Sequence, residues 1–253
     1  MAIQKQKKIK QILSRIPAKT VVTAKQLAAM GVNHVLAADY EKLGWFKRIA
    51  NGAYTRLQEE ACLDGAIYAL QHGDLPTIHV GGSSALSDYY GKLHFVKVGV
   101  KKQLFSLLGK RVPAWFTKVY GGGVGVSYTD FVPSDLGLQE RKTDNFNVLV
   151  SSMERAIFEM LYLVPSKVSV AEAYAIMETV QSVRVHLVQE LLERCRSIKV
   201  KRLFLCFAEN AYMQWFDALD LSRVDLGSGI RKIGKNGMLY PKYNLVIPKL
   251  GEI

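Results

Sequence analysis

Between Lys5 and Arg15, apolar residues recur every three to four positions, with lysine and glutamine between them. This spacing predicts an amphipathic helix whose apolar stripe is formed by Ile9, Ile12, Leu13 and Ile16. Pro17 comes next, and because proline cannot continue a helix, we expect the helix to end there.

Two shorter helical patterns follow. Thr23 is a good N-cap for a helix over Ala24 to Met30, and Asn33 is one for a helix that runs to Leu43. Gly31, between them, can take the left-handed conformation that a tight turn needs. Two short helices joined by a glycine-containing turn of three or four residues predict a helix-turn-helix.

The second helix of such a motif is the one that enters the major groove of DNA. Three apolar residues share one of its faces and are expected in the core: Leu36, Tyr40 and Leu43. The helix is poor in arginine and carries Asp39 and Glu41, so base contacts would depend chiefly on Asn33 and His34 near its start. Ala38 is small enough to let the helix lie close to the bases and touch a thymine methyl group.

After this helix, Asn51-Gly52 stands between two β-prone runs, which is a strong signal for a hairpin. A two-residue turn there pairs Ile49 with Tyr54 and Lys47 with Arg56. Facing cations repel each other, and a phosphate backbone would neutralise them. We therefore interpret the hairpin as the wing of a winged helix-turn-helix; the alternative is a small helical subdomain with a surface hairpin. The residues expected to contact DNA are Lys25, Asn33, His34, Ala38, Lys42, Lys47, Arg48, Asn51 and Arg56.

The rest of the chain mixes helical and extended patterns. Ser151 to Glu154 and Ser169 to Glu172 are capping boxes that open helices, and Phe95 to Val100, Gly125 to Tyr128 and Tyr243 to Ile247 are strand candidates. The predicted fold class is α+β: a winged helix-turn-helix in residues 1–57, followed by a larger mixed α+β domain in residues 58–253.

Charge strengthens the nucleic-acid interpretation. The 253 residues carry a net charge of +12, and residues 1–57 hold eight Lys and three Arg against two acidic residues, a net +9. A basic head on a nearly neutral body is typical of a nucleic-acid-binding domain joined to another function. A possible second basic surface comprises Lys97, Lys101, Lys102, Lys110 and Arg111. For a further basic cluster we expect a solvated helix face, and the alternative is a second set of phosphate contacts: Arg194, Arg196, Lys199, Lys201 and Arg202.

Catalytic and metal-binding patterns are weak. The cysteines, Cys62, Cys195 and Cys206, are scattered and are expected to be reduced and buried, and the five histidines have no metal-ligand spacing. Gly81-Gly82-Ser83 is followed by no pair of carboxylates for two-metal chemistry. The aromatic residues Tyr212, Trp215 and Phe216 are expected in the core. With no signal peptide and no apolar run long enough to span a membrane, we expect a cytoplasmic protein without metal or cofactor.

Taken together, several motifs resemble the AbiEi-type antitoxins of type IV toxin–antitoxin (abortive infection) systems, and the resemblance covers nearly the whole chain. The N-terminal part is similar at residues 23–33, 43–46 and 51–54. The C-terminal part is similar at Gly81 to Leu86 with Tyr90-Gly91, at Val150 to Ala156, at Val200 to Leu205, and at Tyr243 to Pro248.

This resemblance implies a repressor of its own two-gene operon that binds inverted repeats in double-stranded promoter DNA. It also implies an antitoxin that counters a co-expressed nucleotidyltransferase toxin, without a stable complex and without being an enzyme. The alternative is a nucleotide-binding or nucleotidyltransferase-like enzyme with an appended DNA-binding domain. The missing acidic pair and the absence of a P-loop favour the first interpretation.

Overall fold

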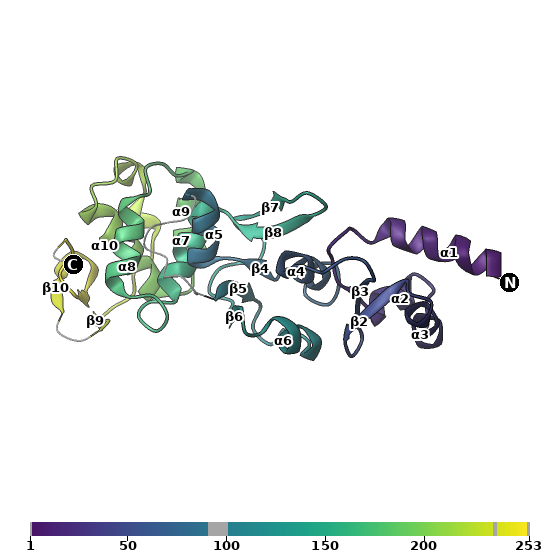
Figure 1. The fold of residues 1–253 in the computed structure, drawn as a ribbon. Coiled ribbons are helices and arrows are strands. Elements are labelled where there is room, and N and C mark those ends of the chain that lie inside the picture. Colours follow the sequence, from purple (N-terminus) through teal and green to yellow (C-terminus); the bar gives the residue numbers. More distant parts are fainter. Residues whose placement is uncertain (1, 91–100, 235–236, 252–253) are drawn as a thin grey trace. The chain divides into compact units, whose positions relative to one another are not determined.

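The computed structural model of the chain describes residues 2–90, 101–234 and 237–251 (Figure 1). Two compact units divide the chain. The first comprises Met1–His79, Phe105–Tyr128 and Glu140–Leu149; the second comprises Val80–Leu104, Thr129–Gln139 and Val150–Ile253. The architecture is mixed α+β with a distinct N-terminal domain, as the sequence predicts.

The N-terminal domain is a winged helix-turn-helix. Its elements are α1 (Ala2–Arg15), β1 (Val22–Thr23), α2 (Ala24–Ala29), α3 (His34–Lys42), β2 (Phe46–Ala50) and β3 (Ala53–Arg56). The strands form an antiparallel sheet in the order β1-β3-β2. Apolar residues of all three helices and of the sheet share one core, in which Leu27, Tyr40 and Phe46 are at most 1% exposed. The stripe predicted on α1 is confirmed, because Ile9, Ile12 and Ile16 are buried in that core.

One residue of the expected core lies elsewhere. Leu43 is 65% exposed, whereas Ala37 is buried beside Tyr40. The reason is the end of α3: Gly44, with φ +75°, turns the chain, and the Trp45 amide donates to the Tyr40 carbonyl at 2.9 Å. This Schellman-type cap brings Trp45 against the core and leaves Leu43 outside it.

The first unit continues with α4 (Leu63–Gln71) and α6 (Ala114–Tyr120). A five-stranded sheet has the order β6-β5-β4-β8-β7. Its strands are β4 (His79–Val80), β5 (Lys102–Ser106), β6 (Val124–Tyr128), β7 (Leu138–Lys142) and β8 (Asn147–Ser151). The strand expected over Gly125 to Tyr128 is confirmed as β6, whereas the one expected over Phe95 to Val100 lies outside the described residues.

Helices dominate the second unit. They are α5 (Gly82–Tyr90), α7 (Met153–Tyr162), α8 (Val170–Glu178), α9 (Val185–Arg194) and α10 (Ile198–Asn210). Helix α7 packs against α5, α8, α9 and α10. After α10 come the short 3-10 turns η1 (Phe216–Ala218), η2 (Leu221–Arg223) and η3 (Pro241–Tyr243). They accompany a small sheet of order β10-β11-β9, made of β9 (Arg231–Lys232), β10 (Met238–Tyr240) and β11 (Leu245–Ile247).

Some local predictions for this unit need correction. Ser169 caps α8 as predicted, but α7 is capped by Ser152, one residue later than the predicted capping box. The Ser151 side chain instead donates to Glu159, which explains why it does not cap. Trp215 is buried as expected, whereas Tyr212 is 91% exposed because it lies just beyond the end of α10.

Of the cysteines, Cys195 and Cys206 are buried and free, as predicted, but Cys62 is exposed. Cys62 stands at the N-cap of α4, where its sulfur accepts from the Gly65 amide at 3.3 Å. Among the helices of the described residues, none is long and apolar enough to cross a membrane.

Candidate nucleic-acid interface

Local hydrogen bonds fix how the helix-turn-helix begins and turns. Thr23 and Gln26 form a reciprocal capping box at the start of α2, and the Asn33 side chain accepts from the Leu36 amide at 2.9 Å at the start of α3. Gly31 joins the helices with φ +77°, as the sequence predicts. Because Asn33 uses its carbonyl oxygen as a cap, only its amide group is left to act as a donor toward DNA.

A groove of about 430 Å³ opens between α2 and α3. It brings three of the predicted DNA contacts together, namely Lys25, Asn33 and His34. The remaining lining residues are apolar or aromatic: Ala24, Ala28, Val32, Ala37 and Tyr54. The lining therefore combines polar and basic side chains with apolar ones.

The other predicted contacts of the helix-turn-helix differ in how firmly they are held. Lys42, Lys47 and Asn51 are exposed, and Ala38 is half-buried on α3. Arg48 is held more firmly: it donates to Glu41 at 3.2 Å and lies 5.3 Å above the Tyr54 ring. Lys25 forms an exposed ion pair with Asp74. Such exposed pairs are weak, so phosphate groups can compete with them for these cations.

The hairpin is present, but its predicted register is wrong by one residue. Lys47 lies opposite Thr55, Arg48 opposite Tyr54, and Arg56 opposite Phe46, with an irregularity at Ile49 between Arg48 and Ala50. This bulge places one extra residue in β2, which shifts by one residue every pair that lies farther from the turn than the bulge. Lys47 and Arg56 consequently do not face each other, and the repulsion expected between them does not exist.

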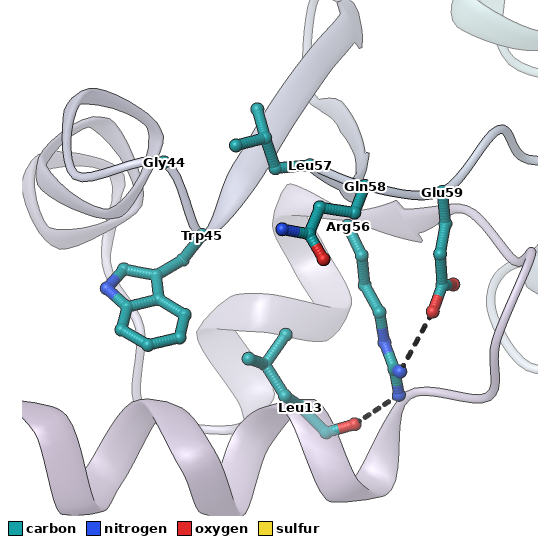
Figure 2. A pocket seen from close by; sticks show the side chains of 7 residues that line it. All are labelled: Leu13, Gly44, Trp45, Arg56, Leu57, Gln58 and Glu59. Carbon is teal, nitrogen blue, oxygen red and sulfur yellow. Dashed lines mark hydrogen bonds and ion pairs between the residues drawn. The ribbon is translucent and has the colours of Figure 1, made fainter.

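Arg56 has a structural role that the sequence did not reveal. Its guanidinium donates to the carbonyls of Leu13 and Ile16 and lies 3.1 Å from the Glu59 carboxylate. Figure 2 shows this side chain extended between α1 and Glu59, in a pocket of about 240 Å³ next to Trp45. A cation near the C-terminus of a helix satisfies its free carbonyls, so Arg56 fastens α1 to the sheet.

Residues of the possible second basic surface belong to different parts of the chain. Lys101 and Lys102 are in the second unit, with Lys101 exposed, whereas Lys110 and Arg111 are exposed in the first. Lys97 lies outside the described residues.

The basic cluster near α10 is largely not a solvated face, contrary to expectation. Lys201 and Arg202 are 4% and 1% exposed. Arg202 donates to the carbonyls of Leu226, Gly229 and Asn244 at 2.7 to 3.0 Å, and Lys199 donates to those of Tyr162 and Val164. Only Arg194 and Arg196 of the cluster are exposed. The cause is that α10 is buried on nearly all sides, so its cations turn to loop carbonyls instead of water.

The glycine-serine segment and the start of α7 form a buried network. Glu159, fully buried, accepts from the Gly82 amide at 3.1 Å, from the Ser151 hydroxyl at 2.7 Å and from Arg155 at 2.8 Å. These partners satisfy the carboxylate and tie α5 to α7, which is a structural task. Among the described residues no three His, Cys, Asp or Glu side chains gather as a metal site would require.

Sequence reasoning missed three small apolar contributors to the helix-turn-helix surface. Ala24 and Ala28 line the groove, and Val35, in the first turn of α3, is 57% exposed. The i, i+4 spacing of the two alanines, which places them on one face of α2, was the available signal.

Comparison with known proteins bears on the whole chain. A family model described as "Transcriptional regulator, AbiEi antitoxin, Type IV TA system" matches residues 100–248, and the model of the corresponding N-terminal domain matches residues 5–98. No functionally curated protein matches the sequence. The crystal structure of the RV2827C protein from Mycobacterium tuberculosis is similar, with a TM-score of 0.59 and 14% identity over 90% of this chain and 86% of that one. At this identity the likeness supports the fold alone.

Proposed function

Since the chain belongs to the AbiEi antitoxin and transcriptional regulator family of type IV toxin–antitoxin systems, we propose that it represses its own toxin–antitoxin operon by binding inverted repeats in the promoter. Residues 1–57 would carry DNA binding and residues 58–253 the antitoxin activity. The protein would counter a co-expressed nucleotidyltransferase toxin without forming a stable complex and without catalysis of its own.

One observation carries the DNA-binding part of this proposal: the winged helix-turn-helix keeps most of its predicted contacts exposed on α2, α3 and β2. Lys42 and Lys47 are free to approach phosphate, and Lys25 and His34 flank the groove between the helices. The net charge of +9 over residues 1–57 supplies the attraction to a polyanion. Arg56 is left out of the proposed interface because its guanidinium is engaged by α1 and Glu59.

The antitoxin part is supported by the family alone. The buried state of Ser83, which is 4% exposed, argues against use of the glycine-serine segment as a nucleotidyltransferase motif. No observation in the described residues favours the alternative of a nucleotide-binding enzyme.

Point substitutions in the full chain test the proposal better than truncation, because the first compact unit extends beyond residue 57. We expect Lys42→Ala/Lys47→Ala to lose repression of a reporter driven by the chain's own promoter, yet still rescue cells from the toxin. The matched control, Arg196→Ala/Lys232→Ala, removes two exposed cations of the second unit and should keep both activities. Unchanged repression by the first variant would contradict the proposed interface.

His34→Ala tests base contact separately from phosphate contact. A base-edge contact carries sequence information and a phosphate contact does not, so this variant should bind the promoter more weakly while its affinity for a scrambled duplex stays the same. Equal losses on both duplexes would show that His34 contacts only the backbone.

A further inference from the structure

Half of the residues that line the groove between α2 and α3 have side chains that cannot form hydrogen bonds. These residues are the exposed Ala24 and Ala28 of α2, with Ala37 and Val32 beside them. Val35, 57% exposed in the first turn of α3, adds further methyl groups to the outer surface of this helix. Water is therefore in contact with an apolar surface in the part of the domain where a helix-turn-helix meets base edges.

The other four lining residues carry hydrogen-bonding groups, namely Lys25, Asn33, His34 and Tyr54. The carbonyl oxygen of Asn33 is taken by the cap of α3, which leaves its amide group as a donor. The His34 ring, when neutral, and the Tyr54 hydroxyl can each both donate and accept. Beside these groups, the alanine methyl groups offer the bases a contact of another kind, which is apolar.

Charge around the groove indicates what occupies it. Lys25 lies in its lining, and Lys42 and Lys47 are exposed on α3 and β2 of the same small domain. A polyanion with an apolar group on its surface fits this combination. In the major groove of DNA the C5-methyl group of thymine is the apolar group presented by the bases.

We infer that the domain selects its DNA site by receiving thymine methyl groups in the alanine-lined groove between α2 and α3. The inference rests on the proposed function in that the ligand is duplex DNA, and it adds the base and the atom that are recognised. Lys25 in the groove lining contacts the DNA backbone, and the alanine methyl groups exclude water from the thymine methyl.

Removal of single methyl groups from DNA tests this directly. A duplex preferred by the full-length protein is first selected from a random library, and each thymine is then replaced by deoxyuridine, which lacks only the C5-methyl group. Burial of one such group is worth about fourfold in affinity, so we expect about a fourfold loss at one or two positions and none at the others. 5-Bromodeoxyuridine, whose bromine is close to a methyl group in size, should restore affinity at the same positions.

Two protein variants test whether the groove causes the loss of affinity that deoxyuridine produces. Ala28→Gly removes a methyl group from the lining, whereas Ala29→Gly removes one from an exposed residue of the same helix that does not line the groove. Both carry the same helix-propensity cost, so differences between them report the groove. Ala28→Gly should reduce the preference for thymine over deoxyuridine at the sensitive positions, and Ala29→Gly should retain it.

The outcomes separate this inference from the proposed function. If the selected duplex binds with no loss at any deoxyuridine position, or if no duplex is preferred over random DNA, recognition of thymine methyl groups is overturned. If deoxyuridine weakens the selected duplex but the chain's own promoter contains no bound site, the inference stands and the proposed autorepression fails.

Discussion

Two regions of the molecule carry clusters of basic residues and use them in opposite ways. On α3 and β2, Lys42 and Lys47 are exposed and available to a ligand, whereas on α10, Lys201 and Arg202 are almost completely buried and bonded to loop carbonyls. The difference follows from the helices: α3 buries one face, and α10 is surrounded. A run of basic residues indicates a nucleic-acid surface only when its helix leaves a face in solvent.

The strongest test of this contrast removes one cation from each region. Arg202→Met removes the donor to the Leu226 and Gly229 carbonyls, while the Asn244 carbonyl still accepts from the Arg231 amide; at roughly 1–3 kcal/mol for each carbonyl left without a donor, we expect unfolding to become easier by about 2 kcal/mol or more. Lys47→Met on the exposed side of β2 should change stability by less than about 0.5 kcal/mol. Chemical denaturation of both variants measures this, and equal losses would remove the distinction.

A similar contrast in burial exists between ion pairs: Glu154 of α7, paired with Arg184, is 3% exposed, whereas Glu41 of α3, paired with Arg48, is 35% exposed. Burial alone would raise the pKa of Glu154, but hydrogen bonds from the Arg184 side chain and backbone outweigh it and lower that pKa from 4.5 to about 2. A carboxylate with a lowered folded-state pKa stabilises the fold above its unfolded pKa, and this contribution is lost as pH falls from about 4.5 to 2.

Glu154→Gln should therefore flatten the stability profile over that acid range, by about 2 kcal/mol because half-exposed Arg184 is screened by solvent. Stability of the unchanged protein and of the variant, measured from pH 7 down to pH 2, checks this, and profiles of the same steepness would contradict the assigned role of Glu154.

A smaller effect concerns how helices end in the two regions. Gly31 and Tyr212 occupy the same position of a Schellman-type cap, with φ +77° and +51°, after α2 and α10. Residues other than glycine are strained in this left-handed conformation, because their Cβ atom approaches the backbone. Tyr212→Gly should stabilise the protein by about 0.5–1 kcal/mol, and Gly31→Ala should destabilise it by about 1 kcal/mol. Thermal unfolding checks both signs; destabilisation by Tyr212→Gly would mean that the tyrosine makes a contact that outweighs its strain.

Patterns local in sequence predicted the winged helix-turn-helix well. Helix boundaries followed from Thr23, Gly31 and Asn33, whose caps and turn depend on neighbours within a few residues. The register of the hairpin did not follow, because Asn51-Gly52 fixes the turn but nothing nearby signals the irregularity at Ile49. The partners of Arg56 lie about 40 residues earlier in the chain, and those of Arg202 lie 24 to 42 residues later, so neither role can be read from a local pattern.

The central claim is that exposed cations of the winged helix-turn-helix, and not the net charge of the whole chain, bind DNA. Titrations of duplex DNA at several salt concentrations test it most directly. If about six phosphates are contacted, the logarithm of the association constant should fall with the logarithm of salt concentration with a slope of about −5. The slope should become shallower by about two in Lys42→Ala/Lys47→Ala and stay unchanged in Arg196→Ala/Lys232→Ala. Equal slopes for the two double variants would contradict the claim.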